Sequence, residues 1–273
     1  MIDMSRLHTP LLVMAGVTLA PVALVAQNET SADGERSPAL THVHHVSVTF
    51  RGTPEDQGLL ATALAEAEIA VQHAALAAQT PDDLEAVMRH AGHVLHALDP
   101  SEVESGPGLG YGAIRASERT AHYIALAARS DGAVPPIETH AEHIEASARN
   151  AAANGTAAAE LLNEILETAA TEETANTEET ANTEEAADTA EAEETEEADA
   201  TEAAAEADET AEADEAVGVA ELLGEVVDLL TAMLEGTDAD GDGRIGWQEG
   251  EGGLAQASTH LGLLRRAAGL EGS

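Results

Sequence analysis

Long runs of β-branched hydrophobic residues are nearly absent from this 273-residue chain, in which alanine, threonine and glutamate dominate. β-Strands favour β-branched and aromatic side chains, which pack well on a pleated surface. The only aromatic residues in the sequence are Phe50, Tyr111, Tyr123 and Trp247. A large β-rich or α/β domain is therefore disfavoured, and the sequence predicts an all-α protein.

The charge balance restricts the partners of such a protein. The chain has 52 acidic residues, 11 arginines and no lysine, and its formal net charge is -41. Nucleic acid is not expected as a partner, because phosphate recognition needs a basic face. There is also no cysteine, which excludes disulfide frameworks, thiolate metal sites and cysteine nucleophiles.

Residues 1–26 have the pattern of a signal peptide. Arg6 is followed by an apolar stretch, residues 11–26, which is short for a membrane span and contains a proline. We expect cleavage near Ala26 and a periplasmic or secreted mature protein without a membrane segment. A retained membrane anchor is the alternative.

The mature chain divides by composition. Residues 27–52 are predicted to form a polar linker that ends in a short extended arm. Residues 53–170 are predicted to form a bundle of four to five helices, with helix starts at Thr53-Pro54 and Thr80-Pro81. Glycines mark residues 106–112 as a loop between two of these helices.

An acidic low-complexity tract follows at residues 171–215. It contains only threonine, glutamate, alanine, asparagine and aspartate, and 20 of its 45 residues are acidic. Because no apolar side chain larger than alanine is present, the tract is predicted to be a disordered, self-repelling linker. Loose calcium binding by its carboxylates is an alternative role.

A calcium-binding pattern of twelve residues lies near the C-terminus, from Asp238 to Glu249. Acidic residues occupy positions 1, 3, 5 and 12, and Gly243 occupies position 6, where the chain must turn sharply. Calcium prefers six to eight oxygen ligands. The expected ligands are side-chain oxygens of Asp238, Asp240, Asp242 and Glu249, together with the main-chain carbonyl of Arg244.

With these residues, the chain resembles the EF-hand family over about residues 217–270, within a predicted EF-hand domain at 216–273. The resemblance implies a helix–loop–helix structure that binds Ca²⁺, with an apolar stripe on the entering helix and a thinner one after the loop. EF-hands usually occur in pairs, and the sequence contains no second loop. Pairing in a homodimer, binding to an unknown protein partner, or packing on the helical bundle is therefore expected.

The helical part carries a repeated histidine motif. His90-Ala91-Gly92-His93 recurs 50 residues later as His140-Ala141-Glu142-His143. Histidines three residues apart share one side of a helix and can together bind a borderline metal such as Cu²⁺ or Zn²⁺. We predict one transition-metal site with His90 and His93 from one repeat and His140 and His143 from the other. This part is loosely similar, in composition and spacing, to small histidine-rich helical metal-binding proteins of the periplasm.

Other readings of the histidines stay open. The repeated pairs lie at or beyond the edge of the apolar arc of their helices, so they are also compatible with a solvated or intersubunit face. A further soft site at His42, His44 and His45 is the alternative to a polar extended arm.

The sequence thus favours a non-enzymatic, exported calcium-binding protein with a second, transition-metal site. The alternative is a calcium-dependent protein–protein interaction module in which the histidines are incidental. No nucleophile, base and acid occur with a recognisable spacing, so no catalytic residues are assigned.

Overall fold

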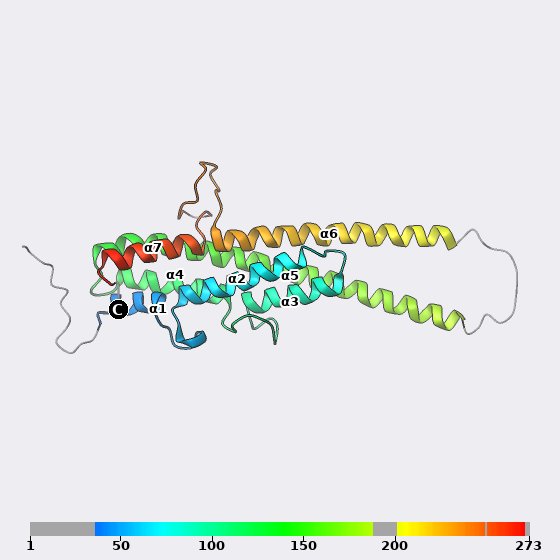
Figure 1. Ribbon diagram of the computed structural model, residues 1–273, viewed down its shortest axis with the longest axis horizontal. Helices are drawn as coiled ribbons and strands as arrows, with labels where there is room; N and C mark the ends of the chain where they lie inside the picture. Colours follow the sequence, from blue (N-terminus) through cyan, green and yellow to red (C-terminus); the bar gives the residue numbers. More distant parts are fainter. Residues whose placement is uncertain (1–35, 188–200, 249, 271–273) are drawn as a thin grey trace, which may run out of the picture. The chain divides into compact units, whose positions relative to one another are not determined.

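The chain is helical in the parts that the computed structural model describes, which are residues 36–187, 201–248 and 250–270, with side chains described outside 172–217. These parts contain seven α-helices, one short 3-10 helix and no β-strand, which confirms the predicted all-α class. The elements in Figure 1 are α1 (Pro38–Ser47), η1 (Pro54–Asp56), α2 (Leu59–Ala77), α3 (Leu84–Leu98), α4 (Ala113–Arg129), α5 (Pro135–Ala187), α6 (Thr201–Glu235) and α7 (Leu254–Ala267).

The helices pack as two successive hairpins to which the remaining helices are added. Helix α2 packs against α3, and α4 packs against α5. Helices α6 and α7 both pack on α5, and α6 also contacts α2, while α1 lies on α4 (Figure 1). The unit that begins at Arg36 contains all of these helices. The predicted signal peptide 1–26 lies outside the described residues.

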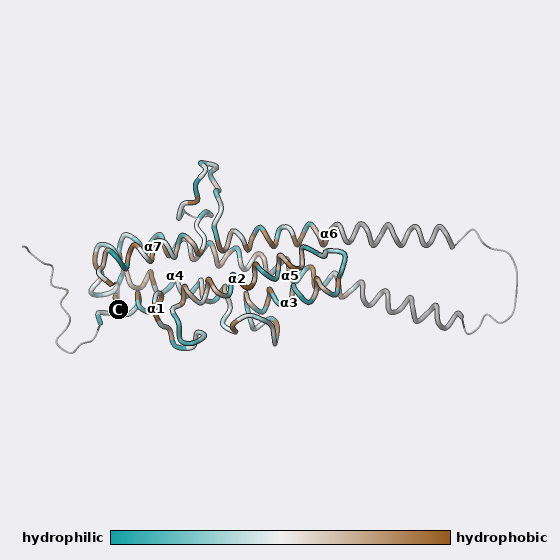
Figure 2. Tube along the Cα trace, in the orientation of Figure 1, coloured by the Kyte–Doolittle hydropathy of each residue, from teal (hydrophilic) through white to brown (hydrophobic). Residues whose placement is uncertain are grey.

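Alanine supplies much of the interior. On α2, Ala63, Ala67, Ala70 and Ala74 are all buried at helical spacing, so their small side chains allow neighbouring helices to approach closely. Larger apolar residues fill the space between the helices, and Figure 2 shows hydrophobic positions recurring along each helix of the bundle. The largest fully buried side chains are those of Leu59, Leu95, Leu98, Ile124, Ile137, Ile144, Leu162, Ile165, Leu223, Leu230, Met233 and Leu254. Each contributes roughly 1.5–3 kcal/mol of burial free energy.

The predicted extended arm is a helix instead. Ser37 caps α1 by accepting a hydrogen bond from the Leu40 amide (3.3 Å), and Pro38 follows as the first helical residue. Ala39, Val43 and Val46 recur at helical spacing and are buried against the bundle. Weak alternation of apolar and polar residues over 41–50 predicts an extended segment. The helix forms instead because it buries the apolar stripe of Ala39, Val43 and Val46.

The tract 171–215 is also helical where its backbone is described. Helix α5 continues to Ala187, and α6 begins at Thr201, so the backbone described at 171–187 and 201–215 is helical, within the tract for which a disordered linker was predicted. Alanine and glutamate are strong helix formers, and this preference acts even where no large apolar side chain is available. Residues 188–200 lie outside the described parts.

The C-terminal segment is part of the bundle rather than a separate domain joined by a spacer. The apolar stripe of α6 is buried, as Leu223, Val226, Leu230 and Met233 show, and it belongs to the same hydrophobic cluster as Leu162 of α5. Three arrangements were expected for an unpaired calcium loop. In this structure the helices that flank the loop, α6 and α7, pack on the helical bundle. Ile245 of the loop remains exposed.

The two predicted helix starts precede the observed ones, since only the short 3-10 helix η1 begins at Pro54 and α2 begins at Leu59. Helix α3 begins at Leu84, later than Pro81, because Asp83 accepts a hydrogen bond from the Ala86 amide (3.0 Å) and caps the helix. Helix α5 continues through Asn154-Gly155. A side chain at Gly155 would press on Ile114 and Met233, so this glycine allows close helix packing.

A buried carboxylate organises the glycine-rich loop 106–112. Glu66 of α2 is fully buried and accepts hydrogen bonds from the amides of Leu109 (2.8 Å), Tyr111 (2.9 Å) and Gly112 (3.0 Å). The anion that these loop amides face is a side chain of the protein itself. The loop is therefore fixed to α2 rather than available for a ligand.

Changing Glu66 to Ala is expected to lower the free energy of unfolding by about 3–5 kcal/mol, because three amides, two of them in buried hydrogen bonds, lose a charged acceptor. The midpoint of thermal unfolding should fall by about 10 °C for a chain of this size. Circular dichroism during heating measures the change, with Glu68→Ala as the control, since Glu68 lies exposed on the same helix. A loss no larger than that of the control would contradict this role.

Candidate metal sites

Three histidines from one helical hairpin converge at the first site, which we call cluster A: His73 of α2 with His90 and His93 of α3. The Nδ1 atom of His73 lies 3.1 Å from that of His90 and 3.4 Å from that of His93. All three side chains are half-buried. The i, i+3 spacing places His90 and His93 on one side of α3, and the packing of α2 on α3 adds His73.

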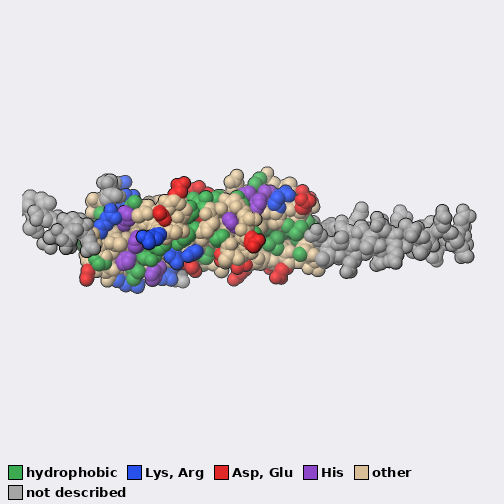
Figure 3. Space-filling model, turned by 90° about the horizontal axis from the view of Figure 1, so that it is seen from below, with side chains coloured by type: hydrophobic (Ala, Val, Ile, Leu, Met, Phe, Trp, Pro, Cys, Tyr) green, Lys and Arg blue, Asp and Glu red, His purple; other side chains and the backbone are tan. Residues whose placement is uncertain are grey.

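A second triad, cluster B, joins His140 and His143 of α5 to His260 of α7. The Nδ1 atom of His260 lies 3.3 Å from that of His140 and 3.1 Å from that of His143. These side chains are also half-buried. Figure 3 shows histidines gathered in two separate areas of the surface that it presents.

Hydrogen bonding alone does not satisfy either triad. A neutral imidazole nitrogen carries either one proton or one lone pair. The central nitrogen, on His73 or His260, therefore cannot make good hydrogen bonds to both of its neighbours at once. One cation that accepts a lone pair from each ring would satisfy all three nitrogens.

The spacing of the nitrogens also fits such a cation. Zinc–nitrogen bonds of about 2.0–2.1 Å in a tetrahedron place neighbouring nitrogens about 3.3–3.4 Å apart. From the central nitrogen of each triad, on His73 or His260, the two neighbouring nitrogens lie 3.1–3.4 Å away, and the three ligand atoms all lie within 4.8 Å of one another. Three ligands leave a fourth position for water or another donor.

The structure changes the predicted grouping of the histidines. His90, His93, His140 and His143 do not meet in one four-histidine site; each pair joins a third histidine in its own cluster. The repeat is not symmetric in this respect. His73 completes cluster A from within its hairpin, whereas the corresponding His122 is exposed on α4, and His260 completes cluster B from α7.

Burial favours the neutral form of four of the cluster imidazoles. Desolvation is the main cause that lowers the pKa of His73, His90, His143 and His260 below 6.5, and neighbouring histidines lower it further. For His90 the Arg89 guanidinium also lowers the pKa, and for His143 the Glu142 carboxylate acts in the opposite direction. Neutral imidazole is the form that binds metals.

The lowered pKa values predict loss of stability in acid. The unfolded chain takes up protons on its histidines near pH 6.5, whereas the folded chain takes them up only at lower pH. Stability should therefore be constant above about pH 7 and decrease as the pH falls below about 6.5. Metal-free protein in about 1 M salt, which screens the general charge repulsion, should lose several degrees of melting temperature between pH 7.5 and 5.5. An unchanged melting temperature would contradict the prediction.

The three aspartates of the predicted calcium loop also converge. Carboxylate oxygens of Asp238, Asp240 and Asp242 lie within 4.8 Å of one another on exposed side chains. The carboxylate of Asp238 accepts hydrogen bonds from the amides of Gly241 (2.8 Å), Asp242 (3.1 Å) and Gly243 (2.9 Å). Gly243 has φ +83°, as the sharp turn at this position requires. Three carboxylates so close together repel, and a cation would relieve that repulsion.

The two other expected calcium ligands of the loop are Arg244 and Glu249, and the structure describes only the first of them. Arg244, whose carbonyl was expected as a ligand, donates its amide to Asp242 (2.8 Å). Glu249, the expected bidentate ligand, lies outside the described residues. Helix α7 begins only at Leu254, because the glycines at 250, 252 and 253 disfavour an earlier start.

The remaining histidines form a different kind of cluster. His42 and His45 of α1 pack against Tyr123 with ring centroids 5.7 and 5.2 Å away, and Phe50 joins them. Their Nδ1 atoms are buried and have no hydrogen-bond partner within the described parts. This arrangement is an aromatic cluster, and among the described residues His42, His44 and His45 are not brought together as a group of three possible metal ligands.

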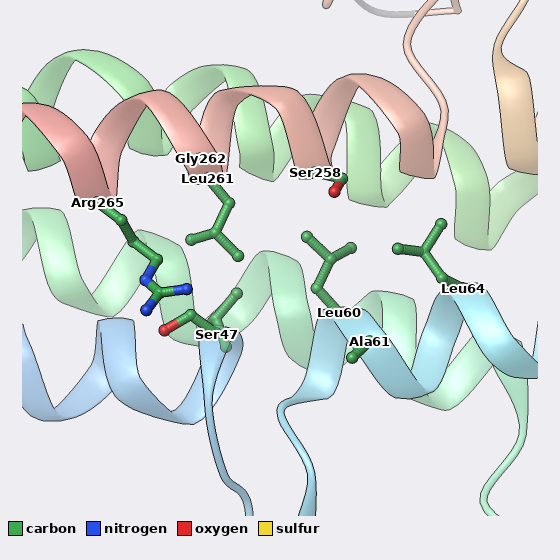
Figure 4. A pocket seen from close by; sticks show the side chains of 9 residues that line it. Ser47, Leu60, Ala61, Leu64, Ser258, Leu261, Gly262 and Arg265 are labelled. Carbon is green, nitrogen blue, oxygen red and sulfur yellow. The ribbon is translucent and has the colours of Figure 1, made fainter. Parts of the chain in front are cut away.

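A hollow of about 260 Å³ lies between α1, α2 and α7 (Figure 4). Leu60, Leu64 and Leu261 make its walls mainly aliphatic, and Arg265 is its charged group. It shares no residue with either histidine cluster or with the aspartate loop.

Comparison with known proteins gives no match to a family model, a curated protein or a solved structure. The case for a function therefore depends on the geometry of the candidate sites.

Proposed function

We propose that this chain is a non-enzymatic metal-binding protein with two transition-metal sites, at cluster A and cluster B, and one calcium site in the loop that begins at Asp238. Zn²⁺ or Cu²⁺ suits the imidazole ligands, and Ca²⁺ suits the oxygen ligands. The sites use different donor atoms, so they select different metals.

The convergence of three Nδ1 atoms in each cluster carries this proposal. The same arrangement is built twice from different helices, once from α2 and α3 and once from α5 and α7. Surface histidines without a function are not expected to converge in groups of three with nitrogens spaced as in a tetrahedral metal site. This observation favours metal binding over the reading in which the histidines are incidental.

The calcium site is proposed on the sequence pattern and on the loop geometry together. Asp238, Asp240 and Asp242 converge, and the turn at Gly243 has the required conformation. Glu249 is proposed as the remaining acidic ligand and the Arg244 carbonyl as the main-chain ligand, by the resemblance to EF-hands.

The cellular setting belongs to the same proposal. Export through residues 1–26 would place the protein in the periplasm or outside the cell, where a cysteine-free chain can bind metals through imidazole and carboxylate. A metal-binding or metal-buffering role is favoured over a calcium-dependent docking module, because the apolar stripe of α6 is already covered by the bundle.

Dialysis of the full chain against Zn²⁺ and Ca²⁺, followed by elemental analysis, tests the proposal. Two zinc ions and one calcium ion per chain are expected. Protein that emerges with neither metal would contradict the proposal, and protein with calcium alone would favour the docking module.

A further inference from the structure

The calcium loop and cluster B share one helix face. His143, Ser147 and Asn150 of α5 lie at i, i+4 and i+7, and therefore on one side of the helix. Four residues that follow the three aspartates contact this side, namely Trp247, Gln248, Gly250 and Gly252. His143 is thus at the same time a member of cluster B and a contact of the loop.

Trp247 makes the closest of these contacts. Its indole stacks on the His143 imidazole with ring centroids 4.0 Å apart and an interplanar angle of 18°. An offset stack of this kind fixes the plane of the imidazole, and aromatic pairs contribute about 0.5–1.5 kcal/mol beyond burial. The orientation of a metal ligand in cluster B therefore depends on a residue of the loop.

Two further contacts hold the loop on α5. The Asn150 side chain donates to the carbonyl of Gln248 (2.8 Å) and accepts from the amide of Gly250 (3.1 Å). Gly252 lies against Ser147 so closely that a side chain at 252 would collide with the serine hydroxyl. Helix α5 therefore holds the chain at Trp247, Gln248, Gly250 and Gly252.

The same segment positions His260. The ends of the loop are joined because the Thr237 amide donates to the Glu251 carbonyl (2.8 Å), and the Glu251 carboxylate accepts from the Gly246 amide (2.9 Å). Helix α7 begins three residues after Glu251 and carries His260. The loop therefore positions two of the three ligands of cluster B, His143 directly and His260 through α7.

We infer that calcium in the loop and a transition metal in cluster B bind cooperatively, each strengthening the binding of the other. The inference rests on the proposed function, since it requires both sites to bind. A cation between the three aspartates removes their repulsion and fixes the loop, which in turn fixes Trp247 and the start of α7. His143 and His260 are then already oriented before zinc binds, so that less conformational entropy is lost on binding.

Cluster A offers an internal control. Its ligands lie on α2 and α3, and none of them contacts the loop. Zinc binding there should not respond to calcium. The sequence also offers a matched pair of substitutions, because Trp247→Phe keeps an aromatic ring on His143 and Trp247→Ala removes it.

The test measures zinc affinity by competition with a zinc-selective chromophoric chelator, in calcium-free buffer and at saturating calcium. The full chain with His73→Ala and His93→Ala reports cluster B alone, and the full chain with His260→Ala reports cluster A. Calcium is expected to tighten zinc binding at cluster B by about five- to tenfold and to change it less than twofold at cluster A. Adding Trp247→Ala should reduce the effect at cluster B to less than twofold, whereas Trp247→Phe should retain most of it.

Equal zinc affinities at cluster B with and without calcium, or weaker binding with calcium, would overturn the inference while leaving the proposed sites intact. Absence of zinc binding at cluster B under either condition would overturn the proposed function and the inference together.

Discussion

Replacing His260 by alanine is expected to remove one of the two zinc ions that the chain binds. Two imidazoles remain in cluster B, and loss of a direct ligand should weaken binding by about 100-fold or more, since loss of even an outer-shell partner costs about 10–100-fold. Isothermal titration with zinc should show two sites in the wild type and one site at the same concentrations in the variant. The melting temperature of the metal-free variant should change little, because His260 is half-buried and its side chain contacts His140 and His143 of the same cluster.

His122→Ala is the matched control. His122 lies late in α4, is exposed and belongs to neither cluster. This variant should still bind two zinc ions. A His260→Ala protein that binds zinc as the control does would show that cluster B is not a metal site.

Changing Asp238 to Asn is expected to weaken calcium binding by about 100-fold. The substitution removes one of the negative charges that attract the ion, while an amide oxygen remains to accept hydrogen bonds from the turn. Glu249→Gln should have a comparable effect by impairing bidentate ligation. Trp247 is the only tryptophan and lies in the loop, so its emission reports the titration.

Glu235→Gln provides the control, because it removes the same charge from an exposed position just before the loop. Its calcium affinity should remain within a few-fold of that of the wild type. Equal calcium affinities for Asp238→Asn and the wild type would show that Asp238 is not a calcium ligand.

Local patterns in the sequence were sufficient where the interactions are local. The pairs His90–His93 and His140–His143 were recognised because three-residue spacing places two side chains on one face of any helix. The aspartate loop was recognised for a similar reason, since its ligands and its turn lie within twelve residues. The same applies to α4, whose bounds agree with the prediction.

Long-range packing decided the rest. His73 joins cluster A only because α2 packs along α3, and nothing near His260 in the sequence indicates that α7 brings it to α5. The division of four histidines between two clusters follows from this packing. A search for histidines on neighbouring helices of each hairpin would have found His73, but no local signal marks His260.

Local composition alone does not decide the backbone conformation of two segments. Residues 41–50 alternate weakly, yet Val43 and Val46 bury a helical stripe. The acidic tract has few groups to bury, yet its alanine and glutamate favour a helical backbone. Glu66 could not be identified from the sequence as a buried residue. Its sequence neighbours give no sign that it lies beneath the loop at residues 109–112.

X-ray absorption spectroscopy at the zinc edge, on the full chain loaded with two equivalents of zinc, tests the central claim most directly. If the clusters are the sites, each zinc ion should be surrounded by about three imidazole nitrogens at about 2.0–2.1 Å and one further light atom. A first shell made only of oxygen, without the outer-shell scattering of imidazole rings, would place the zinc on surface carboxylates and contradict the account.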